Sequence, residues 1–64
     1  MKAHQRRVVD EKADLDEKAT ALSKFIGENK LFLSLSPVEQ ELMKEQCERM
    51  WEYSEVLGKR IDLF

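Results

Sequence analysis

The chain has 64 residues, of which 42% are hydrophobic and 38% are charged, and its formal net charge at pH 7 is −2. A chain this short forms at most a single domain, here residues 1–64. It buries only about 60% of its unfolded surface, so folds of this size usually need disulfides, a metal or oligomerisation. The near balance of acids and bases argues against a protein that binds DNA through bulk positive charge.

The cysteine and histidine content decides which of these three means of stabilisation, disulfides, a metal or oligomerisation, we expect. Cys47 is the only cysteine, which excludes an intrachain disulfide, and its apolar neighbours favour a buried free thiol over a reactive one. His4 and Cys47 are the only strong nitrogen and sulfur ligands, so we expect neither a metal nor another cofactor. The longest uncharged run, residues 31–38, is too short to span a bilayer, and the first residues do not resemble a signal peptide. We therefore expect a cytosolic protein stabilised by oligomerisation.

The first predicted helix covers residues 3–26. Its apolar residues recur at heptad-like spacing and form one seam, made of Val8, Leu15, Ala19, Leu22 and Ile26. Lys12 interrupts this seam, and two interpretations stay open. Its stem lies on the seam with the ammonium in water, or its side chain points into a polar pocket between chains. Gly27 is expected to cap the end of the helix.

The sequence also predicts the connection between the two helices and the start of the second helix. Residues 27–36 contain four apolar side chains that predict a segment folded over the end of the hairpin as one short helical turn: Leu31, Phe32, Leu33 and Leu35. The second helix is predicted over residues 37–62. Ser36 is expected to be its N-cap, Pro37 its first residue, and Glu39 the residue that completes a capping box.

This second helix carries more apolar surface than one neighbour can cover. Its main stripe consists of Met43, Cys47, Met50, Ser54, Leu57, Ile61 and Phe64. A second stripe consists of Leu42, Tyr53, Val56 and Leu63, with Trp51 on the opposite flank. A helix of this kind needs several neighbours. We therefore predict an all-α, antiparallel two-helix hairpin that assembles into a homo-oligomeric helical bundle. Gly58 would allow close approach of a partner backbone, or would lie in a frayed last turn.

Catalysis finds no support in the sequence. Ser54 and the loop serines have no histidine at a recognisable spacing, and the two glycines form no phosphate-binding loop. We therefore do not expect an enzyme.

Positive charge is predicted to gather at one end of the hairpin. Antiparallel helices joined near residue 31 bring the start of the first helix beside the end of the second. Arginines bind phosphate through forked hydrogen bonds, and an aromatic ring can stack on a base. These features predict an anion-binding site made of Arg6, Arg7, Lys12, Tyr53 and Arg60, with Trp51 as a further stacking candidate. The alternative is that nearby acids and the helix dipole neutralise these cations.

Several strings resemble a family of small tailed-phage proteins, among them QRRVVDEK at 5–12, LDEK at 15–18, YS at 53–54 and VLG at 56–58. That family in turn resembles the helical-hairpin domain of phage anti-defence sponges, the anti-CBASS and anti-Thoeris proteins. The resemblance implies a homo-oligomer, typically a hexamer, acting in the cytoplasm of the infected bacterial host. It would sequester a nucleotide immune second messenger, either a cyclic oligonucleotide or an ADP-ribose derivative, without cleaving it.

A second hypothesis comes from the surplus apolar stripe. An unpartnered stripe on a helix can dock into a groove of another protein. The alternative function is therefore a small protein–protein interaction module that acts on a host protein.

Overall fold

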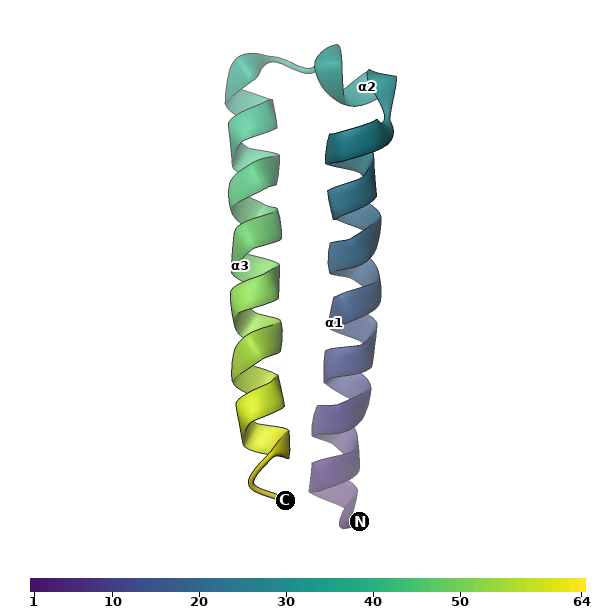
Figure 1. Ribbon diagram of the computed structural model, residues 1–64, viewed down its shortest axis with the longest axis vertical. Coiled ribbons are helices and arrows are strands. Elements are labelled where there is room, and N and C mark those ends of the chain that lie inside the picture. The colour runs from purple at the N-terminus through teal and green to yellow at the C-terminus, as the bar shows by residue number, and fades with distance from the viewer.

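The computed structural model describes residues 1–64 and contains three helices and no strand: α1 (Ala3–Glu28), α2 (Lys30–Leu33) and α3 (Pro37–Ile61). α1 and α3 run side by side in opposite directions, α2 lies in the connection at one end, and both termini lie together at the other end (Figure 1). The predicted all-α hairpin is confirmed, and its long helices end within two residues of the predicted bounds. Assembly into a bundle stays a prediction.

The hairpin is long and thin. Its principal extents are 46 × 15 × 13 Å, and its radius of gyration is 14.5 Å, against roughly 11 Å for a compact domain of this length. Five of the 64 residues are buried: Val8, Ala19, Phe32, Ser54 and Leu57. Two helices share one line of contact, so most of each helix surface faces outward. None of the helices is long and apolar enough to cross a membrane.

The start of α3 follows the predicted cap. The Ser36 hydroxyl accepts a hydrogen bond from the backbone N–H of Glu39 at 3.2 Å, and Pro37 is the first helical residue. The Glu39 side chain makes no return bond, so only half of the predicted capping box forms. The Gln40 side chain donates to the carbonyl of Leu35 at 2.9 Å and ties the connection to the first turn of α3.

The predicted cap at Gly27 is wrong. α1 continues through Gly27 to Glu28, and Asn29 is the C-cap, in an extended conformation with φ −93° and ψ 124°. The Asn29 N–H donates to the carbonyl of Phe25, while its side chain accepts from the N–H of Leu31. Asn29 therefore ends α1 and begins α2. No residue has to adopt the left-handed conformation for which a glycine is suited.

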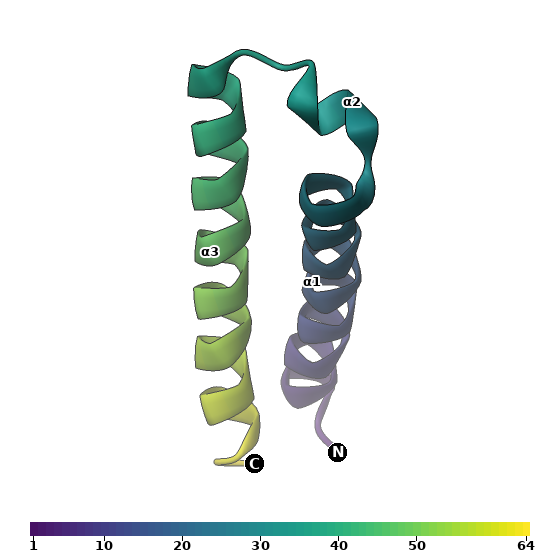
Figure 2. The ribbon, with the colours of Figure 1, turned by 45° about the horizontal axis from the view of Figure 1, so that its top comes forward.

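The predicted helical turn in the connection is confirmed as α2, but only one of its apolar residues closes the core. Phe32 is 4% exposed, and its ring meets the ring of Phe25 edge to face, with centroids 6.2 Å apart. Leu31 and Leu33 are 65% and 75% exposed. Adjacent residues on a helix are about 100° apart, so one short turn cannot turn all three inward. Figure 2 shows this turn beyond the end of α1.

The core itself is one seam between α1 and α3. Ala19 and Leu57 are both 0% exposed, and Val8 is also buried. Three contacts across the seam define the register of the two helices: Lys12 with Gly58, Asp16 with Ser54, and Ser23 with Cys47. The residue numbers of each pair add to 70, so an α1 residue lies level with the α3 residue that completes this total.

Gly58 makes room for a side chain of its own chain. A Cβ added to Gly58 would lie 3.4 Å from Cε of Lys12, so the lysine stem runs across the glycine. Gly58 begins the last turn of α3, and this turn is formed, because the N–H of Asp62 donates to the Gly58 carbonyl at 3.0 Å. The Lys12 stem lies on the seam, as the first interpretation of this residue stated.

Replacing Leu57 by alanine is expected to lower the free energy of unfolding by about 2–5 kcal/mol, because it leaves a cavity in the seam. Chemical denaturation followed by circular dichroism measures this loss. Leu33→Ala removes the same atoms from an exposed position and is expected to change stability by no more than about 0.5 kcal/mol. Equal losses in the two variants would contradict a core centred on Leu57.

Gly58→Ala is expected to raise the free energy of unfolding by up to about 1 kcal/mol, since alanine is the better helix former. The new methyl group would meet Lys12 Cε at an ordinary contact distance. Thermal unfolding and the mass in solution should be measured together. A loss of stability with a fall in mass would instead favour a partner backbone packed against this glycine.

Candidate functional site

A hydrogen-bonded ion pair interrupts the apolar seam. The Lys12 ammonium lies 2.7 Å from Oδ2 of Asp16, one turn further along α1. The hydroxyl of Ser54, which is buried, donates to the other carboxylate oxygen from α3. The hydrogen bond from Lys12, and then the one from Ser54, hold the pKa of Asp16 below its ordinary value of 3.8. In the single chain, Lys12 therefore already has an anionic partner.

A second polar bridge lies closer to the connection. The Ser23 hydroxyl and the Cys47 thiol are 3.1 Å apart and share a hydrogen bond, and the indole N–H of Trp51 donates to Ser23 at 3.3 Å. Cys47 is half-buried rather than fully buried. Sequence reasoning did not single out Ser23 or Asp16. Asp16 and Ser23 are seven residues apart, a spacing that places both on one side of the seam. This spacing could have identified them as residues that face α3.

The open end of the hairpin holds a different cluster. The Tyr53 hydroxyl donates a hydrogen bond across the helices to the carboxylate of Glu11. This bond, and then partial burial and the negative charge of Glu11, raise the pKa of Tyr53 above its ordinary value of 10.0, while the charge of Arg60 opposes the rise. Arg60 follows Tyr53 by two turns on the same face of α3, and Arg7 precedes Glu11 by one turn on α1.

The basic residues of this end fall into two groups. Arg6 pairs with Asp10 at 3.5 Å, and Lys59 pairs with Glu55 at 3.6 Å. Arg7 and Arg60 form no ion pair and are exposed. By the register of the seam, Arg7 lies level with Leu63. It is therefore about one helical turn from Arg60 along the axis.

The five residues predicted to form an anion site thus differ in their position and in whether they already have a carboxylate partner. Arg7, Tyr53 and Arg60 lie at the open end with unused donors or an exposed ring. Arg6 lies at the same end but is paired with Asp10, and Lys12 lies in the seam with Asp16.

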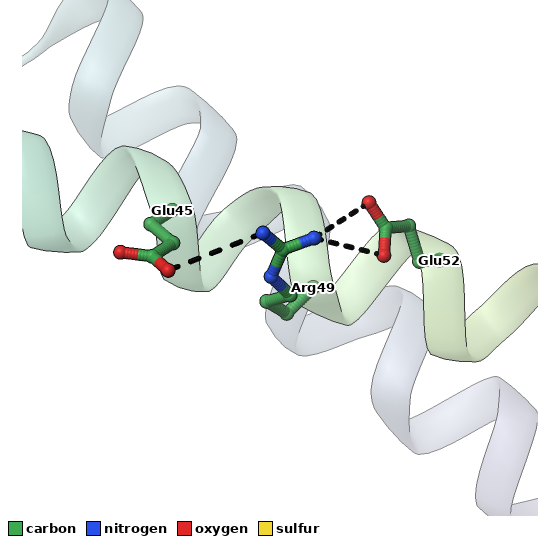
Figure 3. Close-up of polar contacts among 3 residues, drawn as sticks. All are labelled: Glu45, Arg49 and Glu52. Carbon is green, nitrogen blue, oxygen red and sulfur yellow. Dashed lines mark hydrogen bonds and ion pairs between the residues drawn. The ribbon is translucent and has the colours of Figure 1, made fainter.

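Arg49 illustrates what a satisfied arginine looks like in this chain. One of its terminal nitrogens lies 2.9 and 3.0 Å from the two carboxylate oxygens of Glu52, and the other lies 4.0 Å from Glu45 (Figure 3). The hydrogen bonds to Glu52, and then the negative charge of Glu52, raise the pKa of Arg49 above its ordinary value. A ligand would have to break these contacts to use Arg49, whereas Arg7 and Arg60 have no such contacts to lose.

The chemical possibilities of the site follow from these contacts. Ser54, the buried hydroxyl, is bound to a carboxylate and not to a histidine, and His4 is exposed at the start of α1. No three histidine, cysteine or acidic side chains are grouped as they would be around a metal ion. The site offers guanidinium donors and an aromatic ring, which suit an anionic ligand.

A protein-family model described as Sequestin matches residues 2–63. The chain belongs to the Sequestin family. It is 48% identical over 64 residues to an uncharacterised 7.5 kDa protein of Enterobacteria phage T4, encoded in the denB–rIIB intergenic region, and the match covers 100% of this chain and 98% of the T4 protein. No solved structure matches the chain. The resemblance to small phage proteins is confirmed, and the name Sequestin points to a sequestering function in a phage protein.

Replacing Asp16 by asparagine is expected to destabilise the hairpin at pH 7. Because folding lowers the pKa of Asp16, this carboxylate stabilises the fold above about pH 3.8 and loses that effect as the pH falls through the lower folded value. The gap in melting temperature between the natural chain and Asp16→Asn should therefore narrow below about pH 3.8. Melts from pH 7 to pH 2 measure this, with Asp14→Asn, an exposed acid of the same helix, as the control. A gap that stays constant over this range would contradict the prediction.

Proposed function

We propose that this protein is a phage anti-defence protein that binds a nucleotide immune second messenger and keeps it from the host effector without cleaving it. The ligand would be a cyclic oligonucleotide or an ADP-ribose derivative, and the protein would act as a homo-oligomer in the cytoplasm of the infected bacterium. The match of nearly the whole chain to the Sequestin family carries this proposal.

The open end supports an anionic ligand. Arg7 and Arg60 have no carboxylate partner in the chain, so their guanidinium groups are available to phosphate oxygens. Tyr53 is 46% exposed and offers a ring face for a base. Arg6 and Lys12 would join only after leaving Asp10 and Asp16, so we assign them a secondary role. All five residues of the predicted site are thus retained, with Arg7, Arg60 and Tyr53 as its centre.

Tight sequestration also needs more than one hairpin. Small-molecule sites usually bury most of the ligand surface, whereas a ligand held against a rod 13–15 Å thick stays largely in water. The outer face of α3 carries exposed apolar side chains that a second copy would cover: Val38, Leu42, Val56 and Leu63. We propose that such contacts assemble a closed oligomer, a hexamer by resemblance to the anti-defence sponges, with ligand sites between chains.

The same exposed face supports the alternative function. Leu42, Tyr53, Val56 and Leu63 are all exposed in the single hairpin, which suits docking on a host protein. The mass in solution separates the two proposals. A closed oligomer hides this face, while a monomer leaves it available.

Binding should be tested by a thermal-shift screen of the purified protein against cyclic di- and trinucleotides and ADP-ribose derivatives at fixed protein concentration. A ligand at a hundredfold excess over Kd stabilises the fold by about 2.7 kcal/mol, which is a shift of many degrees in so small a domain. Heating the complex and analysing the released ligand by mass spectrometry is expected to return it unchanged. A chemically altered product would contradict sequestration, and a flat screen would favour the interaction module.

For the ligand that gives a shift, Arg7→Gln with Arg60→Gln is expected to weaken binding strongly. The estimate is roughly ten- to hundredfold for each arginine, as for hydrogen bonds to charged groups. Calorimetric titration measures the affinity, and size-exclusion chromatography with light scattering is expected to show an unchanged mass.

The matched control is Arg49→Gln, which removes an arginine that two glutamates already hold. Its affinity should stay within about twofold of the natural chain, as expected for a change away from the site. Full binding by the Arg7/Arg60 double variant would contradict the assigned site.

A further inference from the structure

One contact at the open end places a negative charge where the proposed ligand would bring its own. Glu11 lies across the hairpin from Tyr53 and accepts the hydrogen bond of its hydroxyl. Both residues are exposed, so this bond lies at the surface and not in the seam. The bond joins the two helices one turn from Arg7 along α1 and two turns from Arg60 along α3.

The charges around Glu11 differ from those around its neighbours. Asp10 is paired with Arg6, and Glu55 is paired with Lys59, each within its own helix. Glu11 forms no ion pair, and its hydrogen-bond partner is an uncharged phenol on the other helix. Arg7 lies one turn before it on α1.

Arg60 lies two turns beyond Tyr53 on the same face of α3. Its positive charge opposes the rise in the pKa of the Tyr53 hydroxyl, the group that Glu11 binds. Glu11 and Arg60 therefore share Tyr53 as a neighbour, and a second unpaired arginine, Arg7, precedes Glu11 on its own helix. A carboxylate offers an arginine two oxygens, as a phosphate does.

We infer that Glu11 is a resident anion in the ligand site, which occupies the phosphate position beside Tyr53 in the free protein and is displaced by a phosphate-rich ligand. This inference rests on the proposed function and adds a residue that controls its affinity and selectivity. Glu11 keeps the two arginines from attracting weak or singly charged anions. A ligand with several phosphate charges gains more from the same arginines than displacement of Glu11 costs.

The alternative role of Glu11 is purely structural, as a clamp between α1 and α3. The two roles predict opposite effects of removing its charge. A clamp that holds the site in shape would be weakened by Glu11→Gln, and ligand binding would fall. A resident anion that competes with the ligand would be removed, and ligand binding would rise.

The first measurement needs no ligand. Tyr53 is the only tyrosine of the chain, so the ultraviolet absorbance of phenolate reports this residue alone. Removing the charge of Glu11 leaves Arg60 as the charged group acting on the hydroxyl, so Glu11→Gln should lower the pKa of Tyr53 relative to the natural chain. An unchanged titration would show that Glu11 does not hold Tyr53 in solution and would overturn the inference.

The second measurement uses inorganic pyrophosphate as the probe, in calorimetric titrations of the full chain at constant ionic strength. Glu11→Gln is expected to bind pyrophosphate about tenfold more tightly than the natural chain. Glu48→Gln, which removes an exposed glutamate of α3 far from the open end, is the matched control and should leave the affinity unchanged. The gain from Glu11→Gln should disappear when Arg60 is also replaced by glutamine, because the competition is for that arginine.

These outcomes separate the inference from the proposed function. Equal or weaker pyrophosphate binding by Glu11→Gln overturns the resident-anion role even if a nucleotide is sequestered. Binding of pyrophosphate by neither protein shows that the phosphate position is absent and overturns it as well. Tighter pyrophosphate binding by Glu11→Gln together with a flat nucleotide screen would retain the anion site and reject the proposed nucleotide ligand.

Discussion

The polar cluster of Lys12, Asp16 and Ser54 is the contact on which the register of the hairpin depends. Charged and hydrogen-bonding groups inside an apolar seam are tolerated only when each has its partner, so polar residues at such positions specify one alignment of two helices. A shift of either helix by one turn would separate Asp16 from Ser54 and move Gly58 away from the Lys12 stem.

The register also determines which charges remain available for a ligand. All six ion pairs of the chain join residues three or four apart in one helix, as those of Arg49 with its two glutamates do. Such pairs form wherever the helix forms and are independent of the partner helix. Arg7 and Arg60 have no such pair, and only the antiparallel alignment brings them to one end. The proposed site is therefore made from arginines that form no ion pair within their own helix.

The thinness of the hairpin also bears on its assembly. A single seam buries five residues, while the apolar outer face of α3 is left uncovered. Covering that face with further copies would complete a core and enclose a ligand in one step. The chain belongs to the Sequestin family, whose name points to a sequestering function.

Much of the fold was predictable from the sequence because it depends on local rules. The Ser36–Pro37 start of α3, the two apolar seams and the helical turn at Phe32 all follow from spacing and capping chemistry, which act within a few residues. The Gly27 prediction failed because Asn29 could end one helix and begin the next without a left-handed residue. That choice depended on where α2 had to lie to bring Phe32 onto Phe25.

The candidate site was predictable only in part. Composition and helix direction brought the basic residues to one end, but they could not distinguish Arg7 from Arg6, or reveal that Lys12 already has a partner in Asp16. Nor could they place Glu11 against Tyr53, since these residues are 42 positions apart and meet only through the packing of the helices. The sequence by itself determined which helices form and which faces are apolar. The tertiary structure decided which side chains of the two helices meet, such as Tyr53 with Glu11 and Ser54 with Asp16, because that depends on the alignment of two helices along one seam.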